Sequence, residues 1–292
     1  MCDDAAFDDM IEHNLRQGGL SRRELGSLAL GAGFAFALPR VANAAKTSEA
    51  EVEVKTPDGT ADAYFVHPAA GRHPAVLVWP DIFGLRPAFR QMGRRLAESG
   101  YAVLVINPFY RTKKAPTAPE KASFDDPETR KQLMALRSTL SPATARTDAQ
   151  AFIAWLDAQA AVDTKRKAGT TGYCMGGPLV FETAAVLPDR VGAGATFHAG
   201  GLVSDKPDSP HLLVPKMRAH FLIAIAGNDH EKQPEAKGVL VDAFAKAGLP
   251  AEIEVYAGTL HGWCPPDSAV YHAEQAEKAW ERQLALFKTA LA

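Results

Sequence analysis

The chain has 292 residues, of which 47% are hydrophobic and 23% are charged, a composition typical of a folded globular protein with one large domain or two small ones. Its formal net charge of -2 gives no support for a nucleic-acid partner or for binding to an anionic membrane surface. The three cysteines, Cys2, Cys174 and Cys264, are too few for a disulfide-rich scaffold.

The first 44 residues show the order of features expected of an export signal. Arg22 and Arg23 precede an apolar, uncharged stretch at 28–38, and small residues up to Ala44 mark a cleavage site after that residue. This order favours a twin-arginine signal at 1–44, which would take the chain through the twin-arginine export machinery to the periplasm. The apolar stretch is shorter than the ~20 residues that span a membrane, so no stable membrane anchor is expected. An amphipathic helix with two arginines is the alternative interpretation.

The remainder, 45–292, alternates between strand-like and helix-like patterns in one domain. Apolar or β-branched runs bounded by turn residues predict strands at 51–55, 61–67, 74–79, 102–106, 168–173, 194–198, 221–226 and 253–256. Helical patterns lie between them, at 88–99, 128–138, 144–160, 178–187, 235–247 and 269–291.

This alternation predicts the α/β class. A Pro-Asp-Gly turn at 57–59 makes the first two strands an antiparallel pair, whereas continuous apolar runs such as 74–79 are typical of buried parallel strands. We expect a mostly parallel, twisted sheet of about eight strands with helices on both faces. The Pro-, Lys- and Ala-rich segment 111–126 is expected to be a loop over one edge.

The sequence Gly172-Tyr173-Cys174-Met175-Gly176-Gly177 follows a predicted strand and opens a predicted helix. It has the glycine–nucleophile–glycine spacing of a nucleophile elbow, with cysteine in the place of serine. The residues two before and two after the nucleophile must be small, because larger side chains would collide with the strand and the helix. In such a turn the N–H of Met175 points at a developing oxyanion, and the helix N-terminus stabilises a thiolate on Cys174. A buried structural cysteine in a Gly-rich turn is the alternative.

Two further residues follow the elbow in the chain order of an α/β-hydrolase, which is nucleophile, acid, histidine. Asp229 comes directly after the strand predicted at 221–226, and His261 comes shortly after the strand at 253–256. Asp229 would fix the tautomer of the His261 imidazole and stabilise its protonated form. Each residue alone has an ordinary structural explanation, as a turn aspartate or a loop histidine. Their occurrence in order makes an α/β-hydrolase fold with a Cys174–His261–Asp229 triad the favoured hypothesis.

The sequence holds no motif for a metal or a cofactor. It lacks the His-Glu-x-x-His pattern and paired cysteine spacings of zinc sites, and it has no phosphate-binding glycine loop. We expect neither a metal nor a cofactor. A redox bridge between Cys174 and Cys264 is a minor alternative for the two cysteines, because Cys264 lies close after His261 in the chain.

From about residue 56 to the C-terminus the chain resembles the dienelactone hydrolases, or carboxymethylenebutenolidases. The resemblance rests on five motifs: Trp79-Pro80-Asp81-Ile82-Phe83-Gly84-Leu85, Asn107-Pro108-Phe109-Tyr110-Arg111, the elbow at 172–177, Asn228-Asp229, and His261-Gly262-Trp263.

The resemblance implies several site residues beyond the triad. Ile82 would supply the second oxyanion N–H, and Asp81 stands where the family has a glutamate that holds the resting thiol. Arg111 matches the position of a family arginine that binds the substrate carboxylate, with Tyr110 and Trp263 as further substrate-binding candidates. The family's second arginine, shortly after the histidine, has no counterpart here.

The activity implied is hydrolysis of a small-molecule lactone or enol ester of the dienelactone type through a thioester acyl-enzyme. A general periplasmic carboxylesterase or acyltransferase would use the same triad. A catalytically silent hydrolase fold that serves as a periplasmic binding protein is the alternative from another class.

Overall fold

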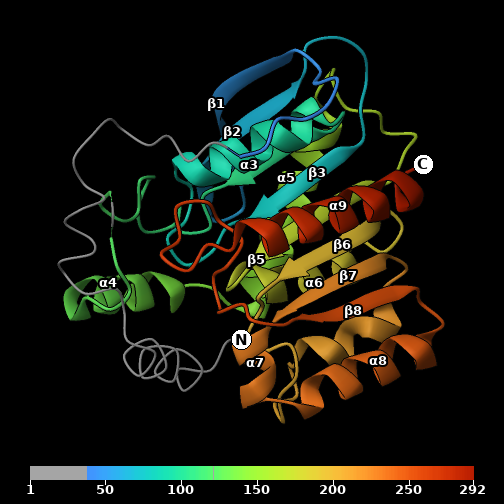
Figure 1. Ribbon diagram of the computed structural model, residues 1–292. Coiled ribbons are helices and arrows are strands. Elements are labelled where there is room, and N and C mark those ends of the chain that lie inside the picture. The colour runs from blue at the N-terminus through green and yellow to red at the C-terminus, as the bar shows by residue number, and fades with distance from the viewer. Residues whose placement is uncertain (1–37, 121) are drawn as a thin grey trace.

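The computed structural model describes residues 38–120 and 122–292, so the arginine pair expected in a signal segment, and the apolar stretch except its last residue, Leu38, lie outside the described residues. Its centre is an eight-stranded sheet with the order β1-β2-β4-β3-β5-β6-β7-β8 (Figure 1). The strands are β1 (Thr47–Thr56), β2 (Gly59–Pro68), β3 (Ala75–Trp79), β4 (Ala102–Ile106), β5 (Ala168–Tyr173), β6 (Val191–Phe197), β7 (His220–Ala226) and β8 (Ala251–Tyr256).

The sheet is antiparallel at one edge and parallel elsewhere. β1 pairs with β2, and β2 pairs with β4, in antiparallel register, whereas β4 through β8 are all parallel. Every residue of β3, β4, β5 and β6 is buried, which explains why these strands read as continuous apolar or small-residue runs rather than as alternating ones. Because parallel strands end at the same edge, the loops after β3, β5, β7 and β8 meet there.

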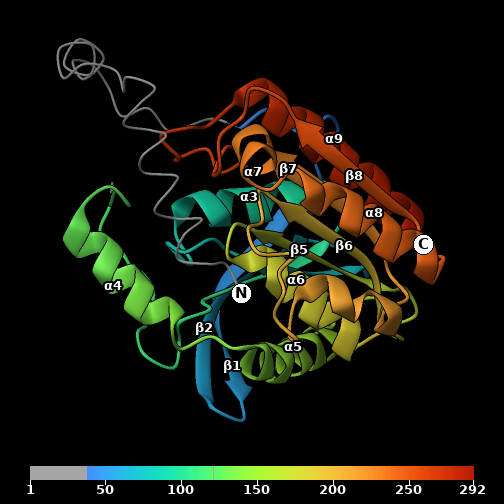
Figure 2. The ribbon, with the colours of Figure 1, turned by 90° about the horizontal axis from the view of Figure 1, so that it is seen from below.

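Helices cover both faces of the sheet (Figure 2). One face carries α3 (Pro87–Glu98) and α9 (Ala273–Ala290), and the other carries α5 (Pro142–Asp157), α6 (Gly176–Val186) and α8 (Glu235–Ala247). The start of α5 is marked by helix-initiating residues in the sequence. It begins with a capping box between Ser141 and Thr144 and has proline in its first turn. A further helix, α4 (Pro127–Arg137), stands apart from both layers in the two views.

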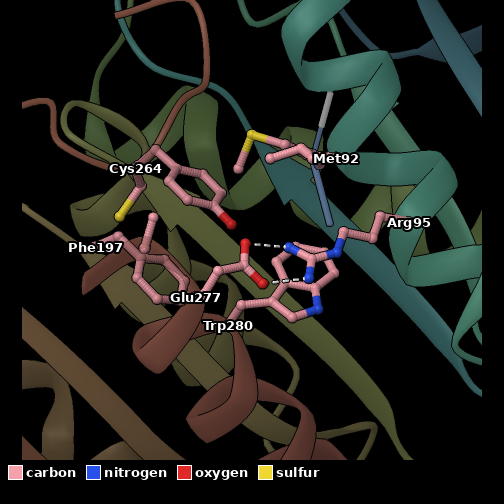
Figure 3. Close-up of a pocket in the computed structure, with 9 residues that line it drawn as sticks. Met92, Arg95, Phe197, Cys264, Glu277 and Trp280 are labelled. Atoms are coloured by element: carbon pink, nitrogen blue, oxygen red, sulfur yellow. Dashed lines mark hydrogen bonds and ion pairs between the residues drawn. The ribbon is translucent and has the colours of Figure 1, made fainter. Parts of the chain in front are cut away.

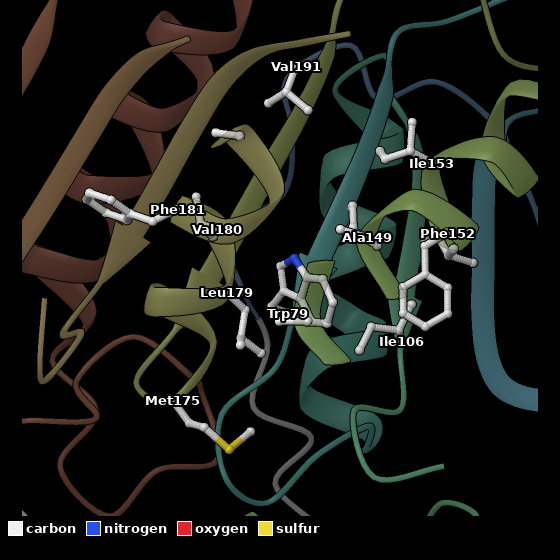
Figure 4. Close-up of a cluster of buried hydrophobic side chains, with 14 of the residues drawn as sticks. Trp79, Ile106, Ala149, Phe152, Ile153, Met175, Leu179, Val180, Phe181 and Val191 are labelled. Carbon is white, nitrogen blue, oxygen red and sulfur yellow. The ribbon is translucent and has the colours of Figure 1, made fainter. Parts of the chain in front are cut away.

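The core between the sheet and α5 and α6 fixes the end of β3 (Figure 4). The indole of Trp79 at the end of β3 packs edge-on against Phe152 of α5 and donates a buried hydrogen bond of 3.1 Å to the hydroxyl of Thr183 in α6. A buried Trp N–H normally finds such a partner. The end of β3 is therefore held against the helix that begins at the elbow.

The predicted fold class is confirmed, and the eight strands and six helices lie close to their expected positions. Two short elements were not predicted: a 3-10 helix at Pro210–Lys216 and α7 (Gly227–Lys232), which places Asp229 on a helix rather than in a turn. The helix expected from residue 269 begins only at Ala273, where the His272 side chain accepts a hydrogen bond from the N–H of Gln275. No helix in the described part of the chain is long and apolar enough to cross a membrane.

Candidate active site

The turn between β5 and α6 places Cys174 at the carboxyl edge of the sheet. Its φ of 51° lies in the left-handed region, which is strained for a residue with a side chain. The N–H of Cys174 is held by the carbonyl of Phe197, at 3.0 Å, at the end of the neighbouring strand β6. The side chain is 4% exposed, and the thiol is free. The strand, sharp turn and helix are arranged as the elbow pattern predicts.

The two glycines of the elbow are required by close backbone approaches. A Cβ on Gly172 would lie 2.3 Å from the carbonyl oxygen of Gly176, and a Cβ on Gly176 would lie 2.3 Å from the carbonyl oxygen of Trp79. Neither position has room for a side chain, because the obstacle in each case is backbone. The second approach also brings the loop after β3 directly against the start of α6.

His261 and Asp229 face each other at the same edge. The Nδ1 atom of His261 lies 2.8 Å from the Asp229 carboxylate, and the backbone N–H of His261 donates to the side-chain oxygen of Asn228, also at 2.8 Å. A second link, from the N–H of Asn228 to the carbonyl of Thr259, joins the two loops again. These bonds fix the imidazole in a plane and tautomer that direct Nε2 to the other side.

The surroundings of His261 favour its protonated form. Burial by itself lowers the pKa of the imidazole, but the Asp229 carboxylate and then the Cys174 sulfur outweigh this effect and hold the pKa well above its usual value near 6.5. The structure thus brings together the three residues expected to form the triad.

Ile82 and Met175, the two expected oxyanion donors, lie on the adjoining loops. Both residues are buried, and neither N–H donates a hydrogen bond to another described residue. Met175 is the N-cap of α6, so its N–H belongs to the group of helix-terminal donors that have no partner within the helix. Backbone N–H groups that bond to no described residue are the kind of donor that can stabilise an oxyanion.

Asp81, expected in the place of the family's thiol-holding glutamate, has its carboxylate paired with groups other than Cys174. One oxygen accepts from Nη1 of Arg86 at 2.6 Å and from the N–H of Phe83, and the other accepts from Nη2 of Arg86 at 2.9 Å. Arg86 also binds Asp267, in the loop after His261, at 2.6 Å. Arg86 therefore bridges the loop of Ile82 and the loop that follows the histidine.

Arg111 and Tyr110, the expected substrate ligands, are bound to protein groups. The Arg111 guanidinium binds Asp58 in the β1–β2 turn and Asp148 in α5, with distances between 2.6 and 3.0 Å. The Tyr110 hydroxyl donates to Asp148 at 2.7 Å and meets the Thr56 hydroxyl at 2.7 Å. Both side chains thus fasten the β1–β2 turn to α5.

Trp263 is a core residue and does not line a substrate site. Its side chain is fully buried and stacks on Tyr256 with 4.8 Å between ring centroids. The next residue, Cys264, is a free thiol and forms no bridge with Cys174. It lines a cavity of about 20 Å³ between α3 and α9, beside the ion pair of Arg95 and Glu277 (Figure 3). This space holds about one water molecule, so it is not a substrate pocket.

Two residues near the site, His198 and Arg86, were not among the functional candidates predicted from the sequence. His198 follows β6 at the same edge, with a left-handed φ of 40°, a fully buried side chain and a ring centroid 5.2 Å from that of His261. Burial and the nearby His261 lower the pKa of His198 well below its usual value, so the ring is neutral at neutral pH. Its place at the end of a strand was a usable signal. Arg86 gave none, because its partner Asp267 lies 181 residues away in the chain.

Within the described residues, no group of histidine, cysteine, aspartate and glutamate side chains is arranged to hold a metal ion. The groups that the structure brings to this edge are a thiol, an imidazole, a carboxylate and two backbone N–H groups. Such a set is suited to nucleophilic attack on a carbonyl carbon.

Comparisons with known proteins point the same way. The model of the dienelactone hydrolase family matches residues 61–291. A protein of Synechocystis sp. that carries the carboxymethylenebutenolidase name is 31% identical over 78% of this chain and 91% of its own length. The carboxymethylenebutenolidase of Rhodococcus opacus is 27% identical over 80% of this chain and 88% of its own. A crystal structure from Klebsiella pneumoniae, titled as a dienelactone hydrolase, has 25% identity and a TM-score of 0.72, covering 84% of this chain and 99% of that one.

Proposed function

The chain belongs to the dienelactone hydrolase family and is a hydrolase of ester or lactone bonds, and we propose that it cleaves them through a Cys174–His261–Asp229 triad. The observation that carries this proposal is the joint position of the three side chains. The free thiol of Cys174 sits in a strained turn beside an imidazole whose other nitrogen lies 2.8 Å from the Asp229 carboxylate. Nucleophile, base and orienting acid are thus in the relation that acyl transfer requires.

In the first half of the reaction the proton of the Cys174 thiol passes to Nε2 of His261. The thiolate attacks the carbonyl carbon, a C–S bond forms, and the carbonyl electron pair moves to oxygen. The N–H groups of Ile82 and Met175 stabilise that oxyanion. The tetrahedral species then collapses: the ester C–O bond breaks, and the leaving oxygen takes the proton from His261.

In the second half water restores the enzyme. His261 takes a proton from water, the hydroxide oxygen attacks the thioester carbon, and the C–S bond breaks. The sulfur regains its proton from His261, and the acid is released. A thioester intermediate forms most readily from esters with good leaving groups, so lactones and enol esters are favoured and amides are poor substrates. The Asp229 carboxylate stabilises the imidazolium that forms in each half.

A general carboxylesterase is the alternative that a specific observation supports. Arg111, the residue expected to bind a substrate carboxylate, is held by Asp58 and Asp148. Without that contact the triad itself still acts on esters of any acid. A catalytically silent binding protein is not supported by any contact at the site.

The triad is tested by comparing the full chain with its Cys174→Ala variant on p-nitrophenyl hexanoate. We expect kcat/KM to fall at least about a thousandfold, because the nucleophile is lost while the fold is kept. Cys264→Ala is the matched control, since Cys264 is also a buried free thiol, and it should retain the activity. Mass spectrometry after rapid quenching should show the hexanoyl adduct on Cys174. Full activity in Cys174→Ala would refute the mechanism.

A further inference from the structure

Arg111, at the carboxyl edge beyond β4, is nearly saturated with protein carboxylates. Nη2 donates to both Asp58 and Asp148, Nε donates to Asp58, and Nη1 donates to Asp148. A guanidinium has five N–H groups, so four are used and one remains. A carboxylate ligand is best bound by two parallel N–H groups, and Arg111 cannot offer them.

Arg86, beside the loop of Ile82, is saturated completely. Its two Nη atoms bind both oxygens of Asp81, Nε and Nη2 bind Asp267, and Nη1 also reaches the carbonyl of Gly84 at 3.4 Å. All five N–H groups are therefore engaged. The guanidinium also packs over the ring of Phe89, 4.9 Å from the ring centroid, so the phenyl ring covers one face of the guanidinium.

Neither arginine can be released easily from its partners. Asp148 is 1% exposed, so removal of Arg111 would leave a buried carboxylate without its charge partner. Arg86 is itself 16% exposed, and its partner Asp81 is 10% exposed. A substrate carboxylate would have to displace carboxylates that the fold already holds in place.

The charge of each cluster opposes an anionic ligand. One guanidinium between two carboxylates carries a net charge of -1, and this holds for both clusters. Two further cations on the loop after β4 are engaged as well: among the residues that the structure describes, Lys113 donates to the carbonyl of Thr117, and Lys114 pairs with Glu53. An anion approaching these loops therefore meets repulsion and finds no free bidentate partner.

From this we infer that the site selects uncharged esters or lactones and discriminates against acyl groups that carry a carboxylate. The inference rests on the proposed hydrolysis at Cys174 and defines the substrate class for it. The carboxylates act as an electrostatic filter, because they lower affinity for the anion without affecting the neutral analogue.

The test uses two substrates with the same six-carbon acyl chain, p-nitrophenyl hexanoate and the mono-p-nitrophenyl ester of adipic acid. With the full chain at low salt, we expect kcat/KM for the neutral ester to exceed that for the anionic ester by about tenfold or more. Added salt should raise the value for the anionic ester alone, since ions screen the repulsion. A wild-type preference for the anionic ester would overturn the inference.

The Asp58→Asn variant tests whether the cluster around Arg111 causes the discrimination against the anionic ester. It leaves Arg111 with one carboxylate, so kcat/KM for the anionic ester should rise by roughly threefold or more, while that for the neutral ester stays within about twofold. Asp189→Asn makes the same charge change in an exposed pair with Arg218, before β6 at the opposite edge, and should alter neither value. An equal response of both esters to Asp58→Asn would contradict the inference.

The Cys174→Ala variant separates the proposed triad from the inferred discrimination against anionic esters. Loss of hydrolysis of both esters in this variant supports the triad, whichever ester the wild type prefers. If the variant keeps its activity, the proposed mechanism fails, but the ranking of the two esters still decides whether the filter exists.

Discussion

Cys174 adopts a backbone conformation that its own side chain disfavours, and the residues around it hold that conformation in place. The φ of 51° turns the chain sharply out of β5, and the two elbow glycines allow strand, turn and helix to touch through backbone alone. His198, directly after the neighbouring strand β6, has the same kind of strained backbone. Both non-glycine strained residues at this edge thus lie within the candidate site, where strain commonly has a functional reason.

At this scale we predict that Gly176→Ala is severely destabilising. The new methyl group would lie 2.3 Å from the carbonyl oxygen of Trp79, and main chain must move to accept it, so the free energy of unfolding should fall by about 2 kcal/mol or more. Urea denaturation would measure the change.

Gly238→Ala, in α8, is the matched control for that experiment. A Cβ atom at this position would meet no neighbouring atom within 4 Å, and alanine is the better helix former by about 1 kcal/mol. We therefore expect a small gain in stability. Equal and mild effects of the two substitutions would show that the elbow is not closely packed.

At the scale of elements, the site depends on loops that are tied to one another. Arg86 joins the loop after β3, which carries Ile82, to the loop after His261 through Asp81 and Asp267. Arg111 and Tyr110 similarly join the β1–β2 turn to α5 through Asp148. The spacing between the loop that carries Ile82 and the loop that carries His261 is therefore set by side-chain bridges as well as by the sheet.

We expect Arg86→Gln to lower kcat for p-nitrophenyl hexanoate by about tenfold or more, because the Ile82 N–H is then less well placed toward the oxyanion. Alkylation of Cys174 by iodoacetamide should keep its rate, since that reaction needs the thiol and His261 but no oxyanion donor. Arg90→Gln is the control: Arg90 lies on the same helix and pairs with Glu51 away from the site. Parallel losses in hydrolysis and alkylation would argue against a positioning role.

The sequence was sufficient for features that depend on local pattern. The strands, the elbow and the order of Cys174, Asp229 and His261 follow from residue spacing that the chain carries within short segments. The sequence was insufficient to predict the side-chain bridges that Arg86 and Arg111 form between loops and helices. Nothing near Arg111 in the sequence marks Asp148 as its partner, and a loop arginine that binds substrate has the same local appearance as one that binds α5. Trp263 likewise looked like a site residue because it follows His261, yet its side chain turns into the core.

At the scale of the whole molecule, the matched family region begins at residue 61 and the Klebsiella structure covers 84% of the chain. The twin-arginine pattern lies before this region, and we propose that it directs the folded protein to the periplasm. The substrate would then be an ester or lactone that occurs outside the cytoplasm.

This proposal predicts that replacing both Arg22 and Arg23 by lysine keeps the protein in the cytoplasmic fraction, because the export machinery recognises the paired guanidinium groups. Cell fractionation with activity on p-nitrophenyl hexanoate in each fraction measures the outcome. Arg16→Lys, a change at an arginine outside the pair, should leave the protein in the periplasm. Periplasmic activity in the double variant would contradict the assignment.

The small cavity in Figure 3 connects the expected cleavage after Ala44 with the solvent access of Cys264. Leu38 forms part of its wall, together with Cys264 and Trp280, although Leu38 precedes the expected cleavage point after Ala44. Cleavage there would remove this wall and open a path from solvent to the Cys264 sulfur. Maturation would then leave a permanent mark on the enzyme: a second thiol open to slow labelling, which tells processed molecules from precursors without any measurement of their mass.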